Sequence, residues 1–258
     1  MLDFFQERPT ELRLLALGVI SIVPTAIGLL IVRWLRPAAE LRREHDVVGY
    51  TFSVVSVIYG VLLGFVLSTI WGQYSHTDEV AQLEGASLRN LYRNSYMLPA
   101  TNQVAIRTAL IAYAHAVAED EWKTLRYRRY SQVAQNALQR MWNSYYAVAP
   151  ATEANKLWLA ESIGTLNEIA KLRSMRILAA EQSVSWLMWV LLLVGGAITC
   201  GFMFAFGVER FRAHLLMTAS VVVLILLIIY ELDNPFWGDP HIDPSAFLSF
   251  IKAYPTPE

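Results

Sequence analysis

Four long apolar segments dominate the pattern of hydrophobic and polar positions along this chain. A helix needs about 20 apolar residues to cross the hydrocarbon core of a bilayer. None of the four segments contains Asp, Glu, Lys, Arg or His, and tryptophan or tyrosine lies near several of their ends, as is typical of membrane interfaces. We therefore expect membrane-spanning helices at residues 14–32, 47–71, 184–206 and 215–230.

The stretch between the second and third apolar segments is more polar, but it also has helical patterning. Its apolar residues recur every three or four positions, and prolines and an arginine-rich RYRRYS stretch at 126–131 separate the runs. Proline disfavours helix in the residue before it, so Pro99 should end the first run. We expect helices at 47–97, 102–125, 132–148 and from an N-cap at Thr152 to residue 206.

These runs predict an all-α fold. The expected architecture is a four-span helical membrane protein with a helical extramembrane domain built on extensions of spans 2 and 3. The chain would then divide into membrane spans 1 and 2 (1–75), the helical domain (76–183), membrane spans 3 and 4 (184–230) and a C-terminal turn and tail (231–258).

Four spans place both termini and the helical domain on the same side of the membrane. The positive-inside rule compares the Lys and Arg residues near the spans on the two sides. The short loops hold Arg33, Arg36, Arg42, Arg43, Arg210 and Arg212. The opposite side holds Arg8, Arg13, Arg89, Lys171, Arg173 and Arg176. The count is six against six, so it does not choose a side.

Composition supports the membrane class and excludes some others. Of 258 residues, 55% are hydrophobic and 17% are charged, against about 25% charged in a typical soluble domain. The net charge of −1 gives no indication of a nucleic-acid partner. Cys200 is the single cysteine, so no disulfide can form within the chain. The N-terminal residues lack the layout of a cleavable signal peptide, and we expect the first apolar segment to remain as a helix.

The second apolar segment has the most regular pattern, a row of small residues spaced by four. Such a row lets helix backbones approach closely. It fits tight packing against another span. The alternative is a face that lines a central pore in an oligomer, with a narrow apolar gate formed by Tyr59, Phe65 or Leu67. The row consists of Ser56, Gly60, Gly64, Ser68 and Gly72.

The absence of ionisable residues from the apolar segments bears on mechanism. Proton pumps and ion-coupled transporters usually place such a residue inside the membrane, so passive conduction or a purely structural role is favoured. No phosphate-binding loop, nucleophile elbow or paired-cysteine motif is present, and we expect neither an enzyme nor a cofactor. His115 and Glu119 lie one helical turn apart, which is weak support for a metal site, and we predict none. The RYRRYS stretch could bind anionic lipid or an acidic partner, or be a solvated loop.

An acidic, proline-rich turn follows the last apolar segment, in ELDNPFWGDPHIDP at 231–244. Asn-Pro and Asp-Pro restrict the backbone to extended or turn conformations. The acidic groups could cap helix N-termini or pair with arginines of the helical domain, and Phe236 could pack under that domain. The alternative is a simple interfacial anchor. The residues of this structural turn are Asp233, Asn234, Pro235, Phe236, Gly238 and Asp239.

Several short motifs resemble those of the bacterial bestrophin-like membrane family. They are YGVLLGFVLSTIW (59–71), Glu84, LYR (91–93), EDEW (119–122) and LDNPFWG (232–238). The order of two spans, a helical insertion, two spans and an acidic turn resembles, more distantly, that of the bestrophin anion channels.

The resemblance implies a pentameric channel of the bacterial inner membrane, with span 2 lining the pore and the helical domain and termini in the cytoplasm. The chain departs from bestrophins where their acidic calcium-binding run is reduced to Asp239 and Asp243, and where only Phe52 and Phe65 remain of the neck phenylalanines. We therefore expect an oligomeric passive ion channel, with anions as the candidate ions and without calcium gating. The alternative is a non-conducting membrane scaffold or regulatory protein whose helical domain binds a partner.

Overall fold

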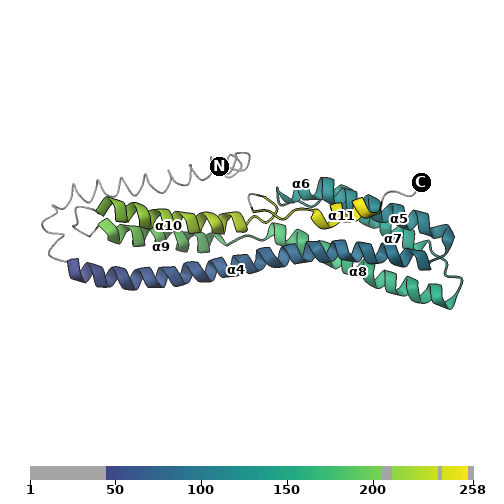
Figure 1. Ribbon diagram of the computed structural model, residues 1–258, viewed down its shortest axis with the longest axis horizontal. Coiled ribbons are helices and arrows are strands. Elements are labelled where there is room, and N and C mark those ends of the chain that lie inside the picture. Colours follow the sequence, from purple (N-terminus) through teal and green to yellow (C-terminus); the bar gives the residue numbers. More distant parts are fainter. Residues whose placement is uncertain (1–44, 205–210, 238–239, 255–258) are drawn as a thin grey trace. The chain divides into compact units, whose positions relative to one another are not determined.

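The computed structural model describes residues 45–204, 211–237 and 240–254, and every regular element within these ranges is a helix (Figure 1). The predicted all-α class is confirmed for this part of the chain. The expected first span, 14–32, lies outside the described residues, as do Gly238 and Asp239 of the turn. The elements are α4 (His45–Asn94), η2 (Ser95–Met97), α5 (Ala100–His115), the π-helix η3 (Ala116–Glu121), α6 (Trp122–Leu125), α7 (Gln132–Tyr146), α8 (Glu153–Glu181), α9 (Trp186–Phe204), α10 (Phe211–Leu232) and α11 (Ser245–Ala253).

The chain divides into two compact units. Unit 1 contains Met1–Gly72 and Val184–Asp233, and unit 2 contains Gln73–Ser183 and Asn234–Glu258. Helix α4 therefore contributes its first part to unit 1 and its second part to unit 2.

Unit 1 is built from apolar helices. Helices α9 and α10 lie side by side (Figure 1). Helix α4 presents one buried face in this unit, because its buried residues recur at intervals of four and three positions. These residues are Tyr59, Leu63, Val66 and Ile70.

Unit 2 contains a connected hydrophobic core. Helices α5 and α7 pack against each other, and α11 packs on α5. Side chains from all of its longer helices are fully buried there, including Leu88, Ile106, Met141, Leu166 and Phe247. This core is formed within a single chain.

Two helices of unit 2 begin with a hydroxyl cap, and the cap at Thr152 confirms the prediction. The Ser131 hydroxyl accepts the Ala134 amide at 3.0 Å at the start of α7. The Thr152 hydroxyl accepts the Asn155 amide at 3.1 Å at the start of α8. Each hydroxyl satisfies an amide that has no partner inside its helix. The arginine-rich stretch breaks the helix as predicted, and Arg128 lies there with a positive φ of 57°.

The prediction of one continuous helix from Thr152 to residue 206 is wrong. Helix α8 ends at Glu181, Gln182 is extended with φ −68° and ψ 144°, and α9 begins at Trp186. The Ser185 hydroxyl accepts the Met188 amide at 3.3 Å, and the Asp233 carboxylate accepts the Val184 amide at 2.8 Å. These polar groups satisfy amides at the start of a new helix, so span 3 has no continuous extension.

The prediction of 231–258 as only a turn and tail is also incomplete. Helix α11 follows Pro244, and its side chains at intervals of three and four positions are buried in the core of unit 2, namely Ala246, Phe247 and Phe250. A nine-residue helix is too short to be stable alone, so this packing stabilises it.

One helix of the described residues, Val48–Met97, is long and apolar enough to cross a bilayer. A second qualifies if α8 and α9 are treated as one broken span. The apolar part of α10, Met217–Leu232, is shorter than a full span. The four-span topology therefore stays a prediction.

Candidate functional site

The row of small residues on α4 lies on the side of the helix that unit 1 leaves open. Gly60, Gly64, Ser68 and Gly72 are exposed, and Ser56 at the start of the row is half-buried. A Cβ atom added to Gly60, Gly64 or Gly72 would meet no described atom within 4 Å. Within the described part of the chain, the row is therefore not packed against another span.

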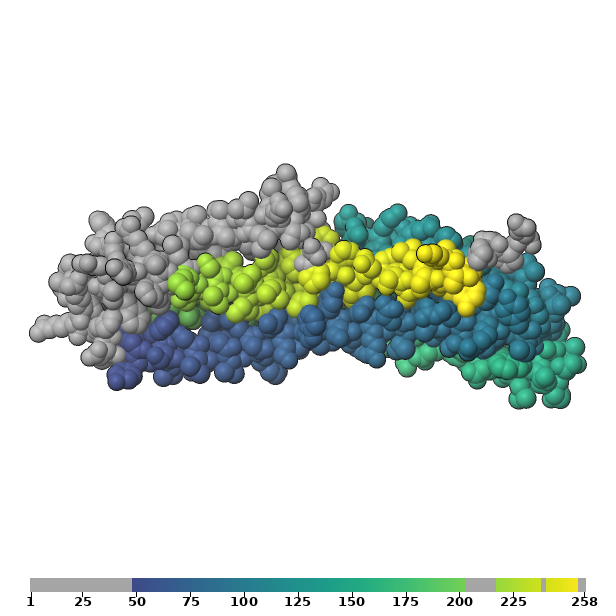
Figure 2. Space-filling model, in the orientation of Figure 1, coloured from purple at the N-terminus to yellow at the C-terminus, as the bar shows by residue number. Residues whose placement is uncertain are grey.

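Large apolar side chains share this open side of α4. Val57 is 66% exposed, Val61 69% and Phe65 70%. In the space-filling view, the first part of α4 (purple) has no other described segment below it (Figure 2). An exposed apolar surface that continues over several helical turns marks a contact with lipid or protein. We call the side of α4 formed by Val57, Gly60, Val61, Gly64, Phe65 and Ser68 the open face.

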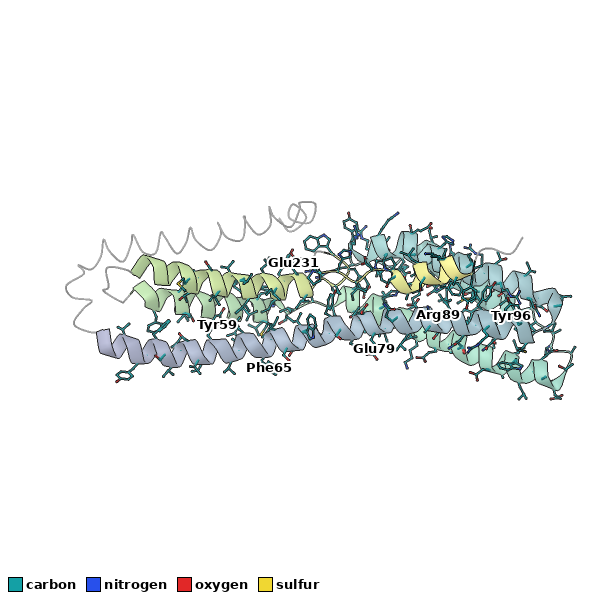
Figure 3. The ribbon with its side chains drawn as sticks, viewed as in Figure 1. Tyr59, Phe65, Glu79, Arg89, Tyr96 and Glu231 are labelled. Carbon is teal, nitrogen blue, oxygen red and sulfur yellow. The ribbon has the colours of Figure 1, made fainter. Side chains whose placement is uncertain are left out.

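Tyr59 lies on the opposite, buried face. Its hydroxyl donates to the Leu192 carbonyl at 2.8 Å, and its ring occupies the space left by two glycines of α9. A Cβ on Gly195 would lie 2.6 Å from the ring, and one on Gly196 would lie 2.9 Å from the hydroxyl. Figure 3 shows Tyr59 directed toward α9 and Phe65 on the other side of α4.

The three alternatives for the predicted gate lie on different sides of α4. Tyr59 is 5% exposed and packs against α9. Phe65 lies on the open face, and Leu67 is half-buried at its border. The gate itself stays a prediction.

The turn after α10 begins with two hydrogen-bonded polar side chains. The Asp233 carboxylate holds the Val184 amide just before α9, which is the helix-capping role considered for the acidic groups. The Asn234 side-chain carbonyl accepts a hydrogen bond from the Arg128 guanidinium at 3.1 Å, so here the arginine pairs with an amide rather than a carboxylate.

The rest of the turn is folded into unit 2. The Trp237 amide donates to the Asn234 carbonyl at 3.0 Å, which closes a tight turn around Pro235. Phe236 is 2% exposed and packs edge-to-face on Trp122 with ring centroids 5.4 Å apart. Phe236 thus packs in the core of the helical domain and is not an interfacial anchor.

The core of unit 2 contains a cluster of buried charges that sequence reasoning missed. Arg176 of α8 contacts Glu84 of α4 through Nε at 2.9 Å and contacts Glu121 of η3 through Nη2 at 2.9 Å. Arg173, one turn earlier in α8, binds Glu121 through Nη2 at 2.6 Å and also donates to Gln135. The two glutamates and Arg176 are fully buried, and Arg173 is 4% exposed.

Neighbouring aromatic residues complete this cluster. The Tyr113 hydroxyl donates to Glu84 Oε1 at 2.6 Å, and burial together with the Glu84 charge raises the pKa of Tyr113 well above its ordinary value. Burial alone would lower the pKa of Arg176, but the Glu84 and Glu121 carboxylates outweigh it and raise that pKa. The Arg176 guanidinium also lies 4.9 Å from the Trp122 ring centroid, in a cation–π contact.

Two carboxylates and two guanidiniums balance in charge, so the cluster fixes the packing of α4, η3 and α8 rather than offering a reactive group. In the sequence, the two glutamates stand out only as residues of short motifs. The two arginines stand out only as positive charges near the expected spans. The spacing of Arg173 and Arg176 by three, on the side of α8 that carries Leu166 and Ile169, was the available signal.

No group of three or more His, Cys, Asp or Glu side chains among the described residues could hold a metal ion. His115 and Glu119 form an exposed pair at 2.7 Å on one helical turn, as their spacing suggested, without a third ligand. Nothing in the described residues fits an inorganic cofactor.

The described residues form two helical units. Unit 1 has an exposed apolar surface, and unit 2 has a hydrophobic core that contains buried ion pairs. A family model described as Bestrophin-like domain matches residues 19–247, and the chain belongs to this family. The family resemblance seen in the sequence motifs is confirmed.

Solved structures of bacterial Bestrophin homologs have the same fold. A variant from Klebsiella pneumoniae is 14% identical, with a TM-score of 0.70, covering 94% of this chain and 97% of that one. Another structure of a homolog from the same organism is 16% identical, with a TM-score of 0.66, covering 97% of this chain and 100% of that one. A structure described as a membrane protein has a TM-score of 0.68 at 15% identity. No curated protein matches the chain.

Proposed function

We propose that this chain is a subunit of an oligomeric, passive ion channel of the bestrophin type, with α4 lining the pore and anions as the conducted ions. The chain belongs to the Bestrophin-like family. The order of its expected spans, helical insertion and acidic turn resembles, more distantly, that of the bestrophin anion channels. The oligomer is a pentamer by the same resemblance.

The observation that carries the proposal is the open face of α4. Its glycines have no described atom within 4 Å of an added Cβ, while Val61 and Phe65 beside them are about two-thirds exposed. Lipid can cover the apolar side chains of such a face, but the row of small residues beside them is typical of close contact between helices. Sister copies of α4 around an axis would cover part of this face, and the small residues would allow the helices to approach closely.

The chemistry of this face favours passive conduction. It offers glycine Cα groups, the Ser68 hydroxyl and apolar side chains, and the expected spans contain no ionisable residue that could carry a coupled proton. Phe65, one residue after Gly64, is the proposed constriction, and Leu67 borders it. A ring of apolar side chains at such a point can gate a pore by excluding water.

The proposed topology has four spans, formed by 14–32, the first part of α4, α9 and α10, with unit 2 as the helical extramembrane domain. The buried ion pairs and capped helices of unit 2 suit an aqueous compartment. By resemblance, this domain and both termini are cytoplasmic, and the bilayer is the bacterial inner membrane.

The test is chloride flux in liposomes that contain the purified full chain. We expect flux from the wild type and its loss in Gly64→Leu, because four added carbon atoms on the open face would block the pore or the assembly. Gly164→Leu is the matched control, since a Cβ at exposed Gly164 in α8 also meets no described atom within 4 Å. This control should conduct like the wild type.

One result would contradict the channel, and another would contradict only its proposed pore lining. The first is absence of flux from a wild-type oligomer of uniform size, which would favour the non-conducting scaffold. The second is a Gly64→Leu protein that assembles and conducts normally, which would exclude α4 as the pore lining. Exchange of chloride for a large organic anion, and of sodium for a large organic cation, would then determine the sign of the conducted ion.

A further inference from the structure

The connection between α6 and α7 is a basic and aromatic loop. Its five consecutive residues, Arg126, Tyr127, Arg128, Arg129 and Tyr130, are all exposed. We propose that this loop binds the phosphate head groups of anionic lipids at the membrane surface where α10 ends. The proposal rests on the membrane topology of the proposed function, and not on conduction.

The position of the loop follows from its hydrogen bond to the turn. Arg128 Nη2 donates to Asn234 Oδ1 at 3.1 Å. Asn234 is two residues beyond Leu232, the last residue of α10, so the extended chain allows at most about 7 Å between their backbones. If α10 ends at the membrane surface, Asn234 and the loop bonded to it lie close to that surface.

The loop has a defined conformation. The amides of Tyr127 and Arg128 donate to Thr124 and Leu125 at 3.0 and 2.9 Å, and Arg128 adopts a left-handed backbone conformation. Leu125 on one side is 2% exposed, and Ser131 on the other side is 1% exposed and caps α7. Both ends of the loop are thus anchored in the core, and its side chains are presented outward.

The charge of the loop is not neutralised by the acidic residues that precede it. Glu119 pairs with His115, Asp120 accepts a hydrogen bond from Ser131, and Glu121 is buried with Arg173. Arg126 and Arg129 form no ion pair with another described residue. The guanidiniums of Arg126 and Arg129, and the part of Arg128 that is not bonded to Asn234, therefore remain available to an anionic surface.

These side chains have the chemistry of a lipid head-group site. Guanidinium binds phosphate oxygens through two parallel hydrogen bonds. Tyr127 and Tyr130 are 64% and 56% exposed, and tyrosine combines an apolar ring with a polar hydroxyl, which suits the interface between acyl chains and water. An acidic protein would satisfy the arginines, but it would not explain why the loop is bonded to the residue that follows α10.

This site also gives a reason to choose a membrane side. The arginine count near the spans was six against six, but anionic lipid attracts a basic surface patch most strongly at the cytoplasmic leaflet. Binding of the loop to this leaflet would favour the cytoplasmic location of unit 2 independently of the family resemblance.

The experiment measures the depth of a spin label in nanodiscs that hold the full chain. The label is attached at Tyr130→Cys in a Cys200→Ala background. The nanodiscs contain phosphatidylcholine with or without about 30% phosphatidylglycerol. This composition is chosen for the assay at about the anionic content of a bacterial membrane. Accessibility to oxygen and to a water-soluble nickel complex gives the depth. With phosphatidylglycerol present, we expect the label at residue 130 to lie in the head-group region. At 1 M salt, the label should move toward water.

Two further labels separate the possible failures. A label at Leu157 is the aqueous reference. Its neighbour Asn155 bonds to Met97, and Met97 lies roughly 40 Å along the chain from Trp71, the end of the expected second span. A label at exposed Leu224 in α10 should lie in the hydrocarbon region. If Leu224 is in water, the proposed membrane topology fails. If Leu224 is in hydrocarbon but the Tyr130 label matches the Leu157 label in anionic nanodiscs, the lipid-binding proposal alone is overturned.

A charge variant tests the role of the arginines. Arg126→Gln with Arg129→Gln should weaken the association of the loop with anionic lipid about fivefold per residue, or about 25-fold in total. The matched control, Arg93→Gln with Arg140→Gln, removes the same charge from other exposed positions of unit 2 and should leave the label depth unchanged. Retention of the anionic-lipid contact in the first double variant would overturn the proposal.

Discussion

Helix α4 passes through both units, and its side chains meet different surroundings in each. In unit 2, Leu88 and Leu91 of this helix are fully buried, and even the charged Glu84 is enclosed with its partners. In unit 1, Val61 and Phe65 are about two-thirds exposed, and only the face that carries Tyr59 is covered.

The difference indicates what each unit needs in order to be complete. The buried charges of unit 2 are balanced, its helix starts are capped, and its hydrophobic core is connected within one chain. Unit 1 has no comparable connected core among its described residues, and apolar side chains project outward from α4, α9 and α10. The described residues of unit 1 therefore leave an apolar surface that lipid or protein could cover, whereas the core of unit 2 is covered by its own helices.

The largest effect should come from removing a charge in the core of unit 2. Arg176→Met would leave Glu84 without its buried counter-charge and would remove one of the two guanidiniums that pair with Glu121, while keeping an unbranched side chain. Breaking a buried ion pair from one side costs about 3–5 kcal/mol. We expect a correspondingly large fall in the thermal unfolding temperature of unit 2, measured by circular dichroism in detergent.

Lys171→Met is the matched control on the same helix. Lys171 is 66% exposed and lies 3.8 Å from Glu168, and exposed pairs contribute about 0–1 kcal/mol. Equal losses in the two variants would contradict the view that unit 2 depends on its buried charge cluster.

A smaller effect is expected from Tyr113→Phe, which removes the hydrogen bond to Glu84 but keeps the ring. Glu84 Oε1 keeps a hydrogen bond from Arg176 Nη2 at 3.2 Å, so the loss is that of one hydrogen bond to a charged group, about 1.5–3 kcal/mol. Because the folded-state pKa of Tyr113 is raised, its contribution is intact below the ordinary tyrosine pKa of about 10 and is lost as the pH rises above that value. The stability difference between wild type and variant should therefore narrow above pH 10. Chemical denaturation at pH 8 and at pH 10.5 would measure it, and a constant difference would contradict this role.

The features that could be predicted from the sequence are those fixed by nearby residues. The hydroxyl cap at Thr152 and the stop at Pro99 depend on the adjacent turn, and both lie where they were expected. The separation of Tyr59 from the open face could also have been predicted, because adjacent helix residues point about 100° apart and Tyr59 precedes Gly60.

Other features depend on residues that are distant in sequence. The break after Glu181 is stabilised partly by Asp233, and α11 is stabilised by burial of Phe247 and Phe250 in a core that earlier helices build. The Arg176 cluster joins residues 92 positions apart, from Glu84 to Arg176. Periodicity gives the face of one helix, but it does not give the partner that covers this face. For the same reason, the sequence left open what the α4 small-residue row contacts.

The most direct comparison of the two units uses two glycines of α4. A Cβ on Gly85 in unit 2 would lie 2.6 Å from the Ala246 Cβ and 3.2 Å from its backbone, whereas one on Gly64 in unit 1 would meet no described atom within 4 Å. Gly85→Ala must therefore displace α11, which costs about 1–3 kcal/mol before a helix-propensity gain of up to about 1 kcal/mol. Gly64→Ala has the same gain in helix propensity without a steric clash. The isolated chain should therefore be unchanged or slightly more stable.

The same pair also reports on assembly. If copies of α4 approach each other along the open face, the Gly64 methyl group lies in the contact, and the oligomer should dissociate at a lower detergent concentration even though the single chain is no less stable. Gly85→Ala should lower the unfolding temperature and leave the subunit contact intact. Light scattering with thermal unfolding on both variants would separate the two properties. Loss of chain stability in Gly64→Ala would mean that another part of the same chain covers the open face, and the contrast between the two units would then disappear.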